Sequence, residues 1–402
     1  MLNLPSVTKD QTIKSLVAAA WLNSPCPGWN YALKFSFGDA NVQFNSALNR
    51  GWKRAHECFR DLGYETPESF INAHSYLPIF KHALGANGYE SLLQDVLGDR
   101  IRHLTFVSVN RVIRTGRYRF CQACVDEALE SRTYACALRT HQIPGVVVCP
   151  DHDLPLMQCA DRVLHIDTPL QKGIVIPPCT LASVASGDEG EVPAASNAFA
   201  RRYARFVQDA LRGRLAAVSS SAFQDAIHAK LHMQLDESLS HESALASRIE
   251  REVPLAIRAE LDSVMARRAS DWPLKLLDGS LAKPHPLASL LVIALVFDDV
   301  SEFNRYAEYA GRLRACHLDE VERLRYGHQG CSDMNHAQLL DRAVQGIRDK
   351  IEQGHLSEAQ AEAADVLTTL AERDRSVVGR VLACFTPDQL GAPADRRVAS
   401  IA

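Results

Sequence analysis

The chain has 402 residues, of which 47% are hydrophobic and 23% charged, and these are the proportions of a folded globular protein. They exclude a chain that is disordered throughout, and the length predicts two or three domains. The net charge of −4 at pH 7 argues against a uniformly basic nucleic-acid binder, although it allows one whose basic residues are gathered on one face.

Residues 1–11 show no basic region followed by an apolar stretch, so we expect no secretory signal. The longest apolar run, residues 287–297, is well short of the ~20 residues that a membrane span needs, and a buried helix is expected there. Eleven cysteines, an odd number, favour thiols or metal ligands in a reducing compartment over a disulfide framework. We therefore expect a cytoplasmic protein without a membrane partner.

The opening segment predicts a helix, because apolar residues recur there at the spacing of one buried stripe: Ile13, Leu16, Val17, Ala20 and Trp21. Thr8 and Gln11 form a capping-box pattern in front of it, and Pro25 ends it. Shorter helical patterns follow at residues 51–62 and 89–97, and no long alternating run indicates a strand. Residues 1–98 therefore predict a helical N-terminal domain, with which a helix-turn-helix is compatible.

Two short pairs of metal-binding residue types follow. Cys121 and Cys124 are separated by two residues, and so are Cys149 and His152. Each pair can wrap a tight turn around one ion, as in structural zinc sites with four protein ligands. The connecting residues contain a helical pattern at 125–131 and a β-rich piece at 143–148. Residues 99–180 therefore predict a zinc-knuckle, zinc-ribbon-like insert that holds one structural zinc ion.

Other readings of these cysteines have less support. A redox pair would need a surrounding βαβ pattern, and a zinc deaminase would need a His-x-Glu element upstream; both are missing. His141 is expected to orient the local fold rather than to bind the ion. A second group has a spacing that matches no standard knuckle, and its cysteines are expected to be buried as small apolar residues: Cys316, His317, His328, Cys331 and His336.

Two arginine-rich runs are candidates for contact with nucleic acid or a partner surface. The first is free of acids and leads into the knuckle: Arg100, Arg102, Arg111, Arg114, Arg117 and Arg119. Arginine suits phosphate oxygens because its guanidinium group can bind them bidentately. The second run lies on a helical pattern that contains Arg201, Arg202 and Arg205, and for it a solvated helix face is the favoured reading.

The second half of the chain predicts another helical domain. Residues 181–198 are rich in Ser, Gly, Ala, Pro and acids, which is typical of a linker. Residues 199–402 are rich in Ala, Leu, Arg and Glu, with helices expected at 339–352, from 357 onward after a break at Gly354, and at 375–385. A helix-turn-helix is compatible with this order, although acids on the middle helix count against it. Residues 1–180 and 199–402 are expected to be separable.

Three ordered segments carry a family resemblance. Residues 119–124 read Arg-Phe-Cys-Gln-Ala-Cys, residues 141–146 read His-Gln-Ile-Pro-Gly-Val, and residues 148–156 read Val-Cys-Pro-Asp-His-Asp-Leu-Pro-Leu. Together with residues 4–22 and 63–85, they resemble the TniQ/TnsD family of transposon target-site selection proteins over residues 1–160. A weaker similarity to the longer TnsD-type members lies at residues 272–297.

The resemblance implies a mostly α, non-catalytic protein that binds zinc and double-stranded DNA and brings an AAA+ transposition regulator and a transposase to an attachment site. It also implies an alternative, in which the chain docks on a CRISPR guide-RNA surveillance complex. A zinc-containing helix-turn-helix transcription regulator stays open from the residues alone, as does a homodimer. An enzyme is not expected, since no phosphate-cradling Gly loop, nucleophile elbow or metalloprotease helix is present.

Overall fold

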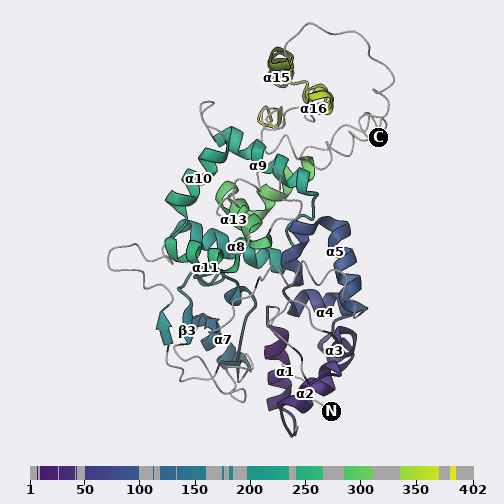
Figure 1. The fold of residues 1–402 in the computed structure, drawn as a ribbon, viewed down its shortest axis with the longest axis vertical. Coiled ribbons are helices and arrows are strands. Elements are labelled where there is room, and N and C mark those ends of the chain that lie inside the picture. Colours follow the sequence, from purple (N-terminus) through teal and green to yellow (C-terminus); the bar gives the residue numbers. More distant parts are fainter. Residues whose placement is uncertain are drawn as a thin grey trace. The chain divides into compact units, whose positions relative to one another are not determined.

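The computed structural model describes residues 7, 10–25, 27–40, 42, 50–98, 112, 118–132, 134–159, 174–175, 181–183, 197–234, 241–265, 285–310, 336–370 and 381–385. These residues are mostly helical and their strands are short, as the sequence predicts (Figure 1). The chain forms two compact units. Unit 1 comprises Met1–Leu215, Glu250–Trp272 and Pro284–Ala294, and unit 2 comprises Ala216–Ile249, Pro273–Lys283 and Leu295–Ala402.

Unit 1 begins with the predicted run of helices: α1 Ile13–Leu22, α2 Trp29–Phe37, α3 Trp52–Cys58, α4 Pro67–His74 and α5 Lys81–Leu97, with the short 3-10 turns η1 Arg60–Leu62 and η2 Leu77–Phe80. Thr12, and not Thr8, caps α1, because its side chain accepts a hydrogen bond from the Ser15 amide at 3.2 Å. Gln11 forms a β-bridge with Leu138, so the backbone is extended there and the helix cannot begin earlier.

Aromatic side chains fill the core between these helices. Trp52 and Phe70 are completely buried and meet edge to face with ring centroids 6.1 Å apart. The Phe59 ring stacks on Phe70 with ring centroids 5.9 Å apart. Each such ring removes a large apolar area from water, so this cluster holds α3 against α4.

The predicted metal-binding segment follows as short strands around one helix. Strands β1 Arg119–Phe120, β3 Met157–Cys159 and β5 Leu181–Ser183 form an antiparallel sheet in the order β1-β3-β5, and β2 Ala135–Cys136 pairs with β4 Ile174–Val175. Helix α7 Gln122–Arg132 confirms the helix expected at 125–131. The β-rich interpretation of residues 143–148 was wrong: they form no strand, and only Val148 makes an isolated bridge, to Pro155.

The reason lies at Gly145, which adopts a φ of +82° and turns the chain. A Cβ atom at this position would lie 3.0 Å from the ring of Tyr203 and 3.3 Å from Ile257, so only glycine combines this φ with this close approach. Tyr203 also donates a hydrogen bond to the carbonyl of Pro144 at 3.2 Å. The buried turn is therefore packed directly against α8 Ala198–Leu211 and α11 Leu255–Met265.

These contacts correct the predicted domain boundary. Helices α8 and α11, and α13 Pro286–Val296 as far as Ala294, belong to unit 1 together with the metal-binding segment. Helix α8 buries one whole face, including Tyr203 and Phe206, so it is part of a core rather than the start of an independent domain. The prediction that residues 1–180 and 199–402 are separable was therefore wrong. The acidic part of the predicted linker, residues 184–196, lies outside the described residues.

Helix α13 is the buried apolar helix expected at 287–297. Within the part of the chain that the structure describes, no helix is both long and apolar enough to span a membrane.

Unit 2 is helical in its described parts, with α9 Ser220–Gln234, a helix over residues 300–310, α15 His336–Glu352 and α16 Leu356–Leu370; α10 His241–Glu252 runs from unit 2 into unit 1. Lys230 and Glu302 form a nearly buried ion pair beside the Phe297–Phe303 ring contact. Gly354 has a φ of +80° and ends α15 as predicted. Of the helix expected at 375–385 only residues 381–385 are described, so the C-terminal helix-turn-helix stays a prediction.

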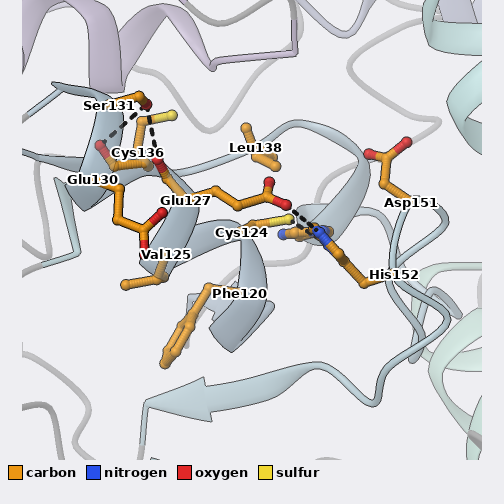
Figure 2. Close-up of a pocket in the computed structure, with 12 residues that line it drawn as sticks. Phe120, Cys124, Val125, Glu127, Glu130, Ser131, Cys136, Leu138, Asp151 and His152 are labelled. Carbon is orange, nitrogen blue, oxygen red and sulfur yellow. Dashed lines mark hydrogen bonds and ion pairs between the residues drawn. The ribbon is translucent and has the colours of Figure 1, made fainter.

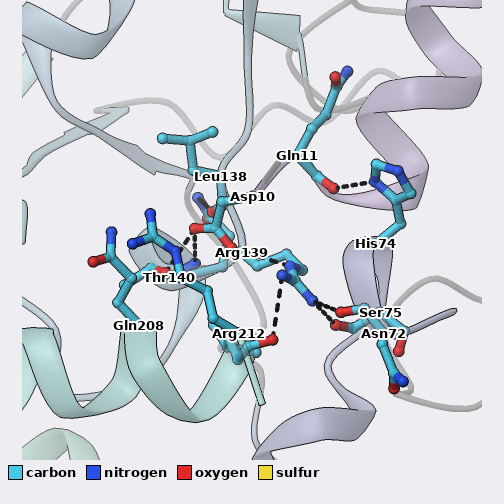
Figure 3. A network of polar contacts seen from close by, with 12 residues as sticks. Asp10, Gln11, Asn72, His74, Ser75, Leu138, Arg139, Thr140, Gln208 and Arg212 are labelled. Carbon is cyan, nitrogen blue, oxygen red and sulfur yellow. Dashed lines mark hydrogen bonds and ion pairs between the residues drawn. The ribbon is translucent and has the colours of Figure 1, made fainter. Parts of the chain in front are cut away.

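One buried polar network joins four stretches of unit 1 (Figure 3). The Arg139 guanidinium is 1% exposed and pairs with the Asp10 carboxylate, with Nε 3.1 Å from Oδ1. Its other nitrogens donate to the backbone carbonyls of Asn72, Ser75 and Leu211. Asp10 in turn accepts from the amide and the hydroxyl of Thr140, at 3.1 and 2.6 Å. Every nitrogen of the guanidinium and both oxygens of the carboxylate therefore have a hydrogen-bond partner inside the protein.

We predict that Arg139→Ala destabilises the protein by about 3–5 kcal/mol, because it leaves the Asp10 carboxylate buried without its cation. Equilibrium denaturation measures the loss. Arg205→Ala is the matched control, since Arg205 also pairs with an aspartate but both side chains are largely exposed, and it should cost about 1 kcal/mol or less. Equal losses in the two variants would contradict this prediction.

Two buried histidines predict acid sensitivity. Burial lowers the pKa of both His74 and His82 to about 4, so between pH 6.5 and 4 the unfolded chain binds more protons than the folded one. Stability should therefore fall as the pH drops through this window, by up to about 3 kcal/mol per histidine.

His82→Gln tests this, because its amide can still donate to the Pro286 carbonyl that His82 Nε2 contacts at 3.1 Å. Denaturation curves at a series of pH values between 7 and 4.5 should show a shallower loss for the variant. Parallel pH profiles for variant and wild type would show that His82 does not contribute.

Candidate metal centre

Two local structures bring the predicted metal ligands together. Cys121 follows β1 and Cys124 lies in the first turn of α7, so the helix start presents both thiols to one side. Cys149 and His152 lie in a tight turn, in which the Asp153 amide donates to the Cys149 carbonyl at 2.9 Å and the Cys149 amide donates to the Leu154 carbonyl at 2.8 Å. Asp153 completes this turn with a φ of +53°.

The four donor atoms have the spacing of a tetrahedral site. All lie within 4.8 Å of one another. The Nδ1 atom of His152 is 3.7, 3.3 and 3.5 Å from the sulfurs of Cys121, Cys124 and Cys149, and the last two sulfurs are 3.7 Å apart. Zinc bonds of about 2.3 Å to sulfur and 2.0 Å to nitrogen give tetrahedral edges of about 3.5–3.8 Å. The four residues can therefore hold a metal ion, and their geometry fits zinc.

The pKa shifts of the three thiols also fit a shared cation. Hydrogen bonds from Cys124 and Cys149 lower the pKa of Cys121 far below its usual value. The hydrogen bond to Cys121 raises the pKa of Cys124, and the pKa of Cys149 rises to about 12 for the same reason. One proton leaves readily, whereas Cys124 and Cys149 retain theirs chiefly because they hydrogen-bond to Cys121 and are partly buried, with a smaller contribution from repulsion between adjacent thiolates. A divalent cation between the sulfurs removes this repulsion, so it would release the remaining protons on binding.

A fifth residue orients the histidine. Glu127, one turn after Cys124 on α7, accepts a hydrogen bond from His152 Nε2 at 2.9 Å, as Figure 2 shows. This bond raises the pKa of His152 and fixes the tautomer in which the Nδ1 lone pair points at the sulfurs. Glu127 was not among the predicted site residues, although its position three residues after Cys124 places both on one helix face.

The structure corrects the role predicted for Arg119. Its side chain is 1% exposed, donates to the Val146 carbonyl at 2.7 Å and pairs with Glu260 of α11. The second Glu260 oxygen accepts from the Gly145 amide at 2.9 Å. Arg119 therefore joins the metal-binding segment to α11, and its guanidinium is buried rather than presented at the surface. Glu260 lies far along the chain, and no sequence signal linked it to this site.

The second arginine run is largely engaged in unit 1. Arg202 donates to the Ala294 carbonyl and lies 3.7 Å from the Glu252 carboxylate. Arg205 pairs with Asp153 of the metal-binding turn at 2.8 Å, and Arg201 is half-buried. Arg205 thus remains exposed but already has an anionic partner, which fits a solvated helix face.

Several predicted residues are not described by the structure: Arg100, Arg102, Arg111, Arg114 and Arg117, and, from the second cysteine and histidine group, Cys316, His317, His328 and Cys331. His336 begins α15. His141 is buried and does not belong to the four-residue metal cluster.

No protein-family model matches this chain, and no curated protein sequence matches it either.

We predict one metal ion per chain, lost in Cys121→Ser, because replacing one of four ligands removes both a bond and the folding free energy that it carries. Elemental analysis of protein purified without chelator measures the content, and denaturation measures the stability. Cys58→Ser is the control, since this thiol donates to the Phe35 carbonyl away from the cluster and a hydroxyl can replace it. Metal-free wild-type protein would overturn the site.

Glu127→Gln should weaken metal binding by about 10–100-fold, since the carboxylate that orients His152 is lost while all four ligands remain. Competition with a chromophoric chelator measures the affinity. Glu130→Gln removes the same charge from the same helix without touching His152 and should leave the affinity within about twofold of wild type. Equal weakening by both variants would assign the effect to overall charge instead.

Proposed function

We propose that the chain is a non-catalytic, zinc-stabilised adaptor that selects the target site for DNA transposition. The observation that carries the proposal is that the segments resembling the TniQ/TnsD family meet in one packed site. Residues 119–124 and 148–156 supply the four metal ligands, and the turn at residues 141–146 contacts Arg119 and Glu260 beside them. The segments that carry the resemblance thus all belong to one site, either as candidate metal ligands or as the turn packed beside them.

The ligand set supports a binding role rather than catalysis. Three sulfurs and one imidazole nitrogen complete a tetrahedral coordination of zinc, which leaves no position for a substrate or a reactive water. Catalytic zinc sites keep such a position open. In this proposal zinc only stabilises the fold, and the chain acts through its surfaces.

The proposed partners are double-stranded DNA, an AAA+ transposition regulator and a transposase. The acid-free run from Arg100 to Arg117 leads into β1, which is fixed to the metal-binding sheet, so these arginines are the best candidates for the target contact. A rigid attachment point favours recognition, because less conformational freedom is lost on binding.

Replacing Arg111, Arg114 and Arg117 together with Ala should weaken DNA binding and make it less dependent on salt. The slope of the logarithm of the binding constant against the logarithm of the salt concentration should fall in magnitude by about 3 if each arginine contacts one phosphate. Fluorescence anisotropy at several salt concentrations measures both. The control triple variant replaces Arg60, Arg214 and Arg251, which are exposed surface arginines of the same unit. Metal content and thermal stability should be unchanged in both.

Co-purification with the products of neighbouring genes decides between the partner classes. Capture of an AAA+ regulator and a transposase supports target selection, and capture of a guide-RNA surveillance complex supports the RNA-guided variant. If DNA affinity is weak in wild type and mutant alike while co-purification is lost in the mutant, the arginines contact a protein partner. A triple mutant that binds DNA and both partners like wild type would overturn the role of this run.

A further inference from the structure

Two aspartates flank the histidine of the metal cluster, and both are held by helix α8. Gln208 donates from Nε2 to both carboxylate oxygens of Asp151, at 3.0 Å each. On the other side of His152, the Asp153 carboxylate accepts from one nitrogen of Arg205 at 2.8 and 3.0 Å. The backbone that carries the histidine is therefore attached to α8 both before and after it.

The anchoring side chains share one face of α8. Positions 205, 208 and 212 are three and four residues apart, so their side chains leave the helix in the same direction. Arg212, the third of them, lies 3.9 Å from the Asp151 carboxylate and adds a weaker attraction. The opposite face of α8 is buried in unit 1, with Tyr203 and Phe206 among its core residues. The anchors thus project from an element that is itself fixed by packing.

The bond from Gln208 is the stronger of the two anchors. Its side chain is only 7% exposed, so water screens its hydrogen bond to the charged acceptor poorly. The Arg205–Asp153 pair is largely exposed on both sides and contributes less. Asp151 lies between the ligands Cys149 and His152 in the chain, so a restraint on its carboxylate also restrains the backbone that joins them.

His152 is the ligand that depends most on such support. Cys121 and Cys149 are completely buried, and Cys124 belongs to helix α7. The His152 ring, by contrast, is partly exposed, and the Glu127 carboxylate that orients it is mostly exposed. Glu127 can set the direction of the ring but cannot hold the backbone beneath it.

We propose that α8 positions His152 as the fourth metal ligand, with Gln208 as the main positioning residue and Arg205 as a weaker support. Release of the turn from α8 would withdraw the imidazole and leave a site of three thiolates. Metal affinity falls in proportion to the fraction of chains whose ligands are all in place, so the α8 contacts raise it. This inference rests on the candidate metal site and not on the proposed role in transposition.

The test compares full-length variants that keep all four ligands. Gln208→Glu preserves the size of the side chain but places a second carboxylate against that of Asp151. Adding Asp151→Asn to it restores one hydrogen bond in the opposite direction. Arg201→Gln is the control, because it changes the net charge by the same amount on the same helix. Among the described residues, Arg201 forms no hydrogen bond or ion pair with the metal-binding turn.

Cobalt(II) is the probe, because it accepts the tetrahedral geometry of zinc and its visible absorption reports which atoms bind it. Anaerobic titration in competition with a chelator measures the affinity, and it is made at pH 8, where carboxyl groups are ionised. The cobalt spectrum of His152→Ala serves as the reference for a site of three thiolates. Denaturation of each metal-free variant measures its stability separately.

We expect Gln208→Glu to bind cobalt about 10-fold more weakly than wild type, with a spectrum shifted toward that of His152→Ala. Arg201→Gln should stay within about twofold of wild type. The double variant Gln208→Glu/Asp151→Asn should return to within about threefold of wild type and recover its spectrum. Wild-type affinity in Gln208→Glu, or no recovery in the double variant, would overturn the proposal. Weaker binding with an unchanged spectrum would do the same, because it would leave Gln208 a structural role alone.

Asp153→Asn tests the second anchor at an exposed position, where the substitution leaves the fold intact. Asparagine tolerates the φ of +53° at this position, and it removes the charge that pairs with Arg205. Cobalt affinity should fall about two- to threefold. Unchanged affinity would contradict the support assigned to Arg205. Wild-type protein that takes up no cobalt would overturn the metal site together with this proposal, whereas co-purification tests the role in transposition separately.

Discussion

The ion pair between Asp10 and Arg139 is the interaction on which unit 1 depends. It joins the segment before α1 to the loop before η3, and through the Arg139 guanidinium it reaches the ends of α4 and α8. A buried charge pair contributes little net stability by itself, because desolvation offsets much of the attraction. Its effect is on specificity, since any other arrangement of these segments would leave a buried charge without its partners.

The metal cluster and the Arg119–Glu260 pair act on the same principle at a smaller scale. A metal ion held by these four residues would fix β1, the start of α7 and the turn at Cys149 relative to each other. Glu260 then holds both the Arg119 guanidinium and the Gly145 amide, so α11 is attached where the backbone turns. The candidate metal-binding segment is in this way joined to a helix more than a hundred residues downstream.

Much of this was predictable where the signal is local. The helix at residues 13–22, the buried helix at 287–297 and the ligand pairs around Cys121 and Cys149 each depend on spacing within a few residues, and spacing is what a sequence displays. The domain boundary was not predictable, because the burial of Tyr203 against Gly145 is a contact between distant segments. For the same reason Arg119 resembled a surface cation: its partner, Glu260, has no sequence relation to it.

The discontinuity of unit 1 has a consequence for how the protein is made. Synthesis must continue from His152 to Glu260, and on to Ala294, before the last parts of this unit exist. At the usual speed of translation the first of these intervals lasts roughly 5–20 s. During that time the cysteine-rich segment has left or is leaving the ribosome without α11 to cover Arg119 and Gly145. If this segment bound a metal ion at this stage, its four ligands would hold it folded until the remaining helices of unit 1 were synthesised.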